Sequence, residues 1–187
     1  MNRGSRDTTI GGMATQLTGI LPLSGRVAIA DAISRRPLHF VWGLGDGKWL
    51  DDVPPADIDA VGLMNEAGRR IISEWKFAIP DDGGSIITVQ DPGSPPSKGR
   101  FSLSPGNAPT NHLYVNCQFD FDDGVGLVIR EAAVVTNTET VEGLPAGQRY
   151  FTPGQIAAPG FLLYVQNLTP IFRSSQTQEY FETVITF

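Results

Sequence analysis

Carboxylates spaced as in a calcium loop occur at residues 120–124, which read Asp-Phe-Asp-Asp-Gly. Glu131 stands at the twelfth position of this stretch, where an EF-hand places its bidentate glutamate. The match then fails, because Gly124 replaces a ligand, Val125 replaces the invariant glycine and no helix pattern flanks the stretch. We therefore predict a hairpin turn here and no metal site.

A glycine-rich stretch at residues 43–47, Gly-Leu-Gly-Asp-Gly, superficially matches a phosphate-binding loop. It lacks the final Lys-Ser or Lys-Thr and a following helix, and Asp46 would repel a phosphate. We predict a tight loop that exposes Trp42 and Trp49. These tryptophans are candidates for a sugar platform or an interface anchor, although core packing is the favoured use of each.

The histidines, His39 and His112, lie in separate predicted strands, and neither has another ligand residue at metal-binding spacing. Cys117, the single cysteine, falls on the apolar face of a predicted strand and lacks an electropositive setting that would activate its thiol. One cysteine also excludes an internal disulfide. We predict no metal, no cofactor and no catalytic residue.

Glu131 shares strand parity with apolar residues, which predicts a buried carboxylate that needs a polar partner. Arg69, Arg70 or another subunit would serve as that partner. An acid hydrolase would need paired carboxylates, for which Asp46 and Asp51 are the other candidates. Because no nucleophile, base and orienting group converge in the sequence, a structural contact is favoured over catalysis.

The elements that position these residues begin with a short helix at residues 25–33, for which Ser24 is the predicted N-cap and Pro37 the stop. Residues 38–44 are predicted as a strand. A turn at residues 65–68 then precedes one alternating strand, and a turn after it predicts a hairpin. Those two hairpin strands are residues 71–79 and 85–90.

Residues 91–110 are rich in Pro, Gly and Ser, which predicts a long surface loop. Residues 113–121 alternate cleanly between apolar and polar side chains, and residues 125–135 are mostly apolar. We predict that these two segments form an antiparallel hairpin at the centre of the fold. Two further strands are predicted at residues 161–168 and 178–187.

The composition fits this pattern, since 21 Gly and 14 Pro are spread among short apolar runs of a 187-residue chain. We predict a mainly β fold, an antiparallel β-sandwich with one short N-terminal helix and long loops. Residues 1–16 are predicted as a flexible arm, and residues 17–187 as a single domain. The net charge of −6 argues against nucleic acid, and no apolar run is long enough to span a membrane.

Several segments resemble the tail-collar domain at the N-terminus of phage tail-fibre proteins, over roughly residues 20–137. They are the 25–33 helix, the Trp-Gly-Leu-Gly-Asp-Gly loop at 42–47, the Asn-Glu-Ala-Gly-Arg-Arg segment at 65–70 and the predicted central hairpin at 119–135 with Ile-Arg-Glu at 129–131. The chain is also similar to small proteins of contractile-tailed phages, with likeness continuing through Arg-Tyr-Phe-Thr-Pro at 149–153 to the last strand.

The resemblance implies a non-enzymatic virion component, made in the host cytoplasm, that works in several copies or as a homo-oligomer beside other tail proteins and fibres. The sequence contains no pattern of a fibre shaft, so we expect a stand-alone baseplate subunit or adaptor that attaches fibres. The expected interface residues are Trp42, Asp46, Trp49, Arg69, Arg70, Tyr150 and Phe151. A carbohydrate-binding or receptor-binding module of the tail remains the alternative.

Overall fold

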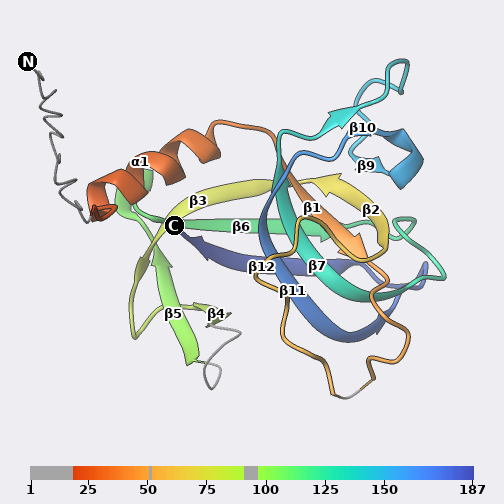
Figure 1. The fold of residues 1–187 in the computed structure, drawn as a ribbon, viewed down its shortest axis with the longest axis horizontal. Coiled ribbons are helices and arrows are strands. Elements are labelled where there is room, and N and C mark those ends of the chain that lie inside the picture. The colour runs from red at the N-terminus through yellow and green to blue at the C-terminus, as the bar shows by residue number, and fades with distance from the viewer. Residues whose placement is uncertain (1–18, 51, 91–96) are drawn as a thin grey trace, which may run out of the picture.

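The computed structural model describes residues 19–50, 52–90 and 97–187, so the predicted 1–16 arm lies outside the described residues. Within them, one α-helix accompanies two five-stranded sheets and one two-stranded ribbon (Figure 1). All of the strand pairs in these sheets are antiparallel. The prediction of a mainly β, antiparallel fold with one helix is confirmed.

The first sheet has the strand order β11-β7-β1-β2-β9. In that order its strands are Phe161–Phe172, Val128–Thr136, Leu38–Gly43, Glu66–Ile71 and Tyr150–Phe151. β1 lies at the centre and is buried along its whole length, because both faces of the sheet are covered. Phe40 and Trp42 belong to the main core, whereas Val41 packs in a smaller cluster with Leu63 from the following loop.

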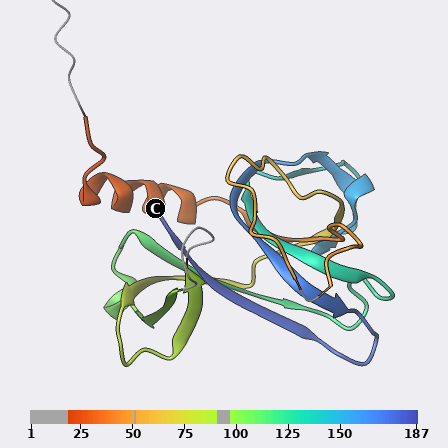
Figure 2. The same ribbon diagram turned by 60° about the horizontal axis from the view of Figure 1, so that its bottom comes forward.

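The second sheet has the strand order β12-β6-β3-β5-β4. In that order its strands are Glu179–Thr186, His112–Phe119, Glu74–Pro80, Ser97–Leu103 and Ile86–Gln90. The sheet curls until its edge strands β12 and β4 touch, which encloses a small second core (Figure 2). That core consists of Ala78, Ile86, Phe101, Tyr114 and Val184.

Two short strands form the remaining ribbon, in which β8 (Glu139–Thr140) pairs with β10 (Ile156–Ala158). Short 3-10 turns, η1 and η2, occupy Pro105–Asn107 and Pro153–Gln155.

The main core lies between the two sheets and includes Trp42 of β1 with Cys117 and Phe119 of β6. The rings of Trp42 and Phe119 stack with centroids 3.4 Å apart and 16° between their planes. Both side chains are fully buried, and burying aromatics of this size is a large source of folding free energy. The favoured core packing of Trp42 is therefore confirmed, and the prediction that the loop exposes Trp42 was wrong.

The helix α1 spans Leu23–Ser34, which confirms the predicted helix. Pro22 occupies the N-cap position and no side chain caps the helix, so the prediction of Ser24 as the cap was wrong. Ser24 lies instead in the first turn. Ala30 packs in the main core, and this contact places the helix at one end of the sandwich.

The turn predicted at residues 65–68 and the single strand predicted at 71–79 were both wrong. β2 already begins at Glu66, and β2 and β3 belong to different sheets. The apolar side chain of Ile72 is buried in the main core where the chain crosses between the sheets. Ile72 and Phe77 both belong to this core but have opposite strand parity, so the alternation changes phase at the break.

The predicted hairpin of residues 71–79 with 85–90 was also wrong, because β5 lies between β3 and β4 and pairs with both. β5 occupies residues 97–103 of the predicted 91–110 loop, so the loop prediction was wrong for this part. The strand escaped prediction because Phe101 and Leu103 are its only large apolar residues. Pairing on both sides stabilises it in place of an amphipathic pattern.

The predicted central hairpin was wrong as well, although both of its strands exist. β6 pairs with β3 and β12, whereas β7 pairs with β1 and β11. The turn after β6 therefore carries the chain from one sheet to the other. Since β6 ends at Phe119, Phe121 does not continue its buried face and is exposed.

Candidate interaction site

The predicted chemical groups are held in structural roles. His39 is buried edge-on against Phe151, and burial, followed by the charge of Arg69, lowers the pKa of His39 to about 4. Burial raises the pKa of the Cys117 thiol to about 12, so the thiol stays protonated. Within the described ranges, no three His, Cys, Asp or Glu side chains are grouped as metal ligands would be.

Glu131 of β7 is buried, as predicted, but the arginines proposed as its partners do not contact it. Its Oε2 atom accepts the backbone N–H of Gly45 at 3.1 Å, and its Oε1 atom accepts that of Met64 at 3.1 Å. The carboxylate reaches both amides because Gly43 has no side chain; a Cβ there would lie 2.4 Å from Oε2. Glu131 therefore closes the base of the loop that joins β1 to β2.

The glycine-rich stretch in that loop is folded by local contacts. Asp46 accepts the backbone N–H of Lys48 through Oδ1 at 2.9 Å. Trp49 is half-buried and its ring packs against Gly45. The backbone carbonyl of Trp49 accepts a hydrogen bond from Nε of Arg130 at 3.2 Å. This arrangement is an ordinary side-chain-stabilised turn held down by an arginine, with no phosphate cradle.

Arg69 is 2 % exposed and makes a two-pronged ion pair with Glu66, at 2.8 and 2.7 Å. Its Nη1 atom also donates to Thr138 Oγ1 and to the carbonyl of Pro159, at 2.6 and 2.7 Å. The side chain thereby fastens the segment that carries β8 and β10 onto β2. Its guanidinium is fully engaged inside the chain, and the interface role predicted for it stays a prediction.

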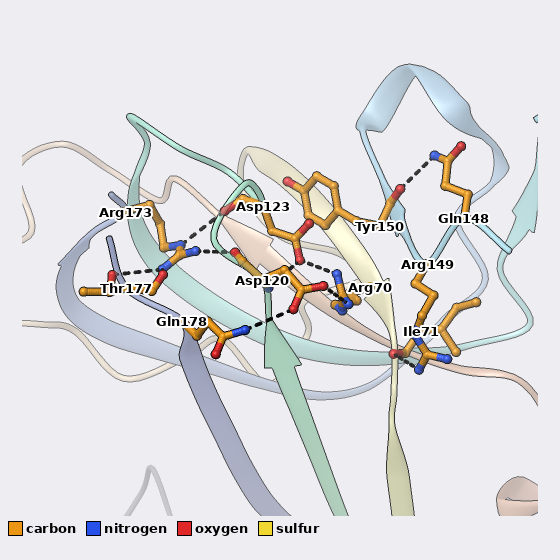
Figure 3. Close-up of polar contacts among 10 residues, drawn as sticks. All are labelled: Arg70, Ile71, Asp120, Asp123, Gln148, Arg149, Tyr150, Arg173, Thr177 and Gln178. Carbon is orange, nitrogen blue, oxygen red and sulfur yellow. Dashed lines mark hydrogen bonds and ion pairs between the residues drawn. The ribbon is translucent and has the colours of Figure 1, made fainter. Parts of the chain in front are cut away.

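Arg70 and Arg173 clamp one turn from two sides (Figure 3). Arg70 forms ion pairs with Asp120 and Asp123. Arg173, at the end of β11, donates to the backbone carbonyls of the same two aspartates at 2.8 and 3.2 Å. It also lies over the ring of Trp42, 5.1 Å from the ring centroid. Two of the carboxylates that suggested calcium, those of Asp120 and Asp123, are thus paired with Arg70.

Tyr150 and Phe151 of β9 also face inward. Phe151 is buried, and Tyr150 is half-buried with its ring edge-on to Phe119. Burial first, then nearby carboxylates, raises the pKa of Tyr150 to about 12. Its hydroxyl occupies the space above Gly68, where a Cβ would lie 2.1 Å from it. Arg70 and Phe151 are thus buried and Tyr150 packs against the core, and the interface roles predicted for these residues stay predictions.

The clamped turn displays apolar side chains that the sequence reasoning missed. We define residues 120–126 and 172–178 as the clamped end, because the backbone N–H of Gly126 donates to the carbonyl of Arg173 at 3.1 Å. Phe121, Val125 and Phe172 are 45 %, 47 % and 74 % exposed there. Phe121 and Val125 belong to predicted strands whose patterns favour burial, and Phe172 lies beyond the predicted 161–168 strand, so the sequence holds little signal of their exposure.

These features define a β-sandwich whose polar side chains brace its turns and whose rigid turns present apolar groups. The family model described as "Baseplate wedge 3 tail fiber network component" matches residues 18–187. The chain belongs to this family, which confirms the expectation of a phage baseplate and tail-fibre-related protein. No curated protein matches the chain. Among the described residues, no helix combines the length and apolar character that a membrane crossing requires.

Proposed function

We propose that this chain is a non-catalytic structural subunit of the phage baseplate that attaches tail fibres to it. It resides in the virion tail, is made in the host cytoplasm and occurs in several copies within a symmetric assembly. The family description supports a place in the network between baseplate and fibres. The tail-collar resemblance agrees with this role.

The observation that carries the proposal is the clamped end. Burying a guanidinium costs several kcal/mol, and the contacts of Arg70 and Arg173 with one turn offset this cost, although the buried Nε atom of Arg70 has no hydrogen-bond partner. The clamp fixes a turn whose apolar residues point to solvent. A rigid apolar surface loses little entropy on binding, so this arrangement favours association with other proteins.

The alternative functions have less support. A sugar platform built on the two predicted tryptophans would need their ring faces exposed, whereas Trp42 is fully buried and Trp49 packs on its own loop. A hydrolase needs free carboxylates, whereas both oxygens of Glu131 accept backbone N–H groups and Asp46 stabilises its turn. Asp51 lies outside the described residues.

Peptide mass spectrometry of purified phage particles tests the proposal. We expect the chain at a fixed number of copies relative to a major tail protein. The double variant Phe121→Ser/Phe172→Ser, co-produced with the wild type, should enter particles about tenfold less often, because interface hot spots carry at least this much affinity.

Leu103→Ser is the matched control, since Leu103 is 48 % exposed on β5 of the second sheet. It should enter particles as the wild type does. Both variants should keep the melting temperature of the wild type. Absence of the wild-type chain from particles would remove the proposed function, and normal entry of the double variant would remove the clamped end as its site.

A further inference from the structure

A second apolar surface lies on residues 52–64, in the long connection between β1 and β2 that covers the outer face of the first sheet (Figure 2). Ile58 and Val61 are 97 % and 93 % exposed, and Met64 is also largely exposed. Single exposed apolar residues are common, but several in one short segment indicate an interaction surface.

This surface is held by hydrogen bonds to its backbone, so its side chains remain free. Glu131 accepts the N–H of Met64, and Asn167 of β11 donates to the carbonyl of Pro54 at 3.0 Å. Asp57 accepts the N–H of Asp59 at 2.9 Å, which forms a local turn with Ile58 inside it. Ile58 is therefore displayed at a fixed position, and a partner would not need to order the segment.

A cavity of about 250 Å³ lies beside this projection. It separates residues 56–60 from β11 and is lined mainly by apolar groups, among them Ala56, Ala60, Leu162 and Val165. The surface thus combines a projecting apolar side chain with an adjacent apolar recess. A partner that grips Ile58 could place a side chain of its own in the recess.

The charge around the surface is of one sign. Asp52, Asp57 and Asp59 are exposed, and the sequence contains no Lys or Arg between Lys48 and Arg69. Acidic residues at the rim of an interface favour basic residues opposite. A second copy of this chain fits poorly, because Asp57 also lines the recess and two copies would bring like charges together.

We infer that residues 52–64 dock into an apolar cleft, rimmed by Lys and Arg, on a different protein of the tail. The inference rests on the proposed function, because it names the chemistry of one neighbour within that assembly. The apolar contacts supply affinity, and the acidic rim selects the basic partner.

Two double variants and two controls test the docking surface in particles that also contain the wild type. Ile58→Ser/Val61→Ser removes the two most exposed apolar side chains of the surface. Asp52→Lys/Asp59→Lys reverses the charge of its acidic rim. Leu103→Ser/Val141→Ser and Asp82→Lys/Glu142→Lys change exposed residues of the same types elsewhere.

Each test variant should enter particles about tenfold less often than the wild type, as expected for loss of an interface hot spot. The control variants should enter normally, and all four should keep the wild-type melting temperature. Equal entry of both test variants and the wild type would overturn the inference and leave the proposed function intact. Absence of the wild type itself would remove the proposed function.

A photo-reactive phenylalanine analogue in place of Ile58, illuminated in assembled particles, identifies the neighbour directly. We expect a cross-link to a different tail protein, at an apolar position with Lys or Arg beside it. A cross-link to a second copy, or to a site without basic residues, would overturn the assigned partner chemistry. The same analogue at Asp82 should give no such product.

Discussion

Arg69, Arg70 and Arg173 are almost excluded from solvent, and each connects segments that are distant in sequence. Arg69 joins β2 to residues 138 and 159, and the other two join β2 and β11 to the turn after β6. A guanidinium suits this task because it has several donors in a fixed planar arrangement. Nothing in the sequence distinguishes these three arginines from exposed ones, which is why interface roles were predicted for Arg69 and Arg70.

His39 shows the same limit of single-residue reasoning, with a consequence for pH. It is buried beside Arg69, and its Nδ1 atom has no hydrogen-bond partner in the structure. The folded pKa of about 4 lies below the ordinary histidine pKa of 6.5, so between these values the unfolded chain binds more protons. The free energy of unfolding should therefore fall as the pH is lowered from about 6.5 to about 4.

The fall attributable to His39 should be on the order of 3 kcal/mol, from the size of the pKa shift. Burial also lowers the pKa of His112, which adds a contribution of the same sign. We therefore measure the free energy of unfolding by urea at several pH values. Between pH 6.5 and 4 it should fall less steeply with decreasing pH for His39→Gln than for the wild type. Parallel curves for the two proteins would contradict the buried neutral histidine.

At the scale of elements, most strands were predictable but their pairing was not. The alternation in β6, the apolar runs of β7 and β11 and the mixed pattern of β12 are local, and the structure has strands there. Pairing joins segments far apart in the sequence, so it depends on which faces find a common core. The placement of β5 between β3 and β4 is the clearest case, because proximity in sequence favoured a hairpin.

The connection from β3 to β4 provides a test of this placement. A Cβ on Gly84 would lie 2.2 Å from the backbone carbonyl of Phe101 in β5, whereas one on Gly83 would meet nothing closer than 3.5 Å. Gly84→Ala should therefore destabilise the fold by about 1–3 kcal/mol, as overpacking does. Gly83→Ala should change stability by less than about 0.5 kcal/mol.

Thermal and urea unfolding of both variants would measure this difference. The wild type and Gly83→Ala should unfold together, and Gly84→Ala should unfold earlier. Equal stability of the two alanine variants would mean that β5 does not pass beside Gly84.

For the whole molecule, the sequence predicts that the polar 1–16 arm contributes to assembly more than to folding. Deleting residues 2–16 should leave the melting temperature unchanged and reduce the number of copies in particles. Quantitative mass spectrometry of particles would measure the reduction. A chain with residues 2–16 in scrambled order is the control for length, and full incorporation of the deleted chain would contradict the prediction.

The candidate surfaces also emerge only at this scale. Phe121 and Phe172 come from separate strand ends, and Ile58 comes from a loop whose base is held by Glu131. The sequence predicted Glu131 as a buried polar contact because of its strand parity. Its partners are backbone N–H groups, and every residue has one, so no side-chain pattern could identify them.

Composition and local periodicity determined by themselves that this protein is mainly β, has one short helix and keeps Cys117 in its core. These properties follow from side-chain polarity and backbone preference over a few residues. Only the tertiary structure decided which strands pair, that three arginines are buried, and which apolar side chains remain outside. Those outcomes depend on contacts between distant segments, where burial, pairing and charge are satisfied together.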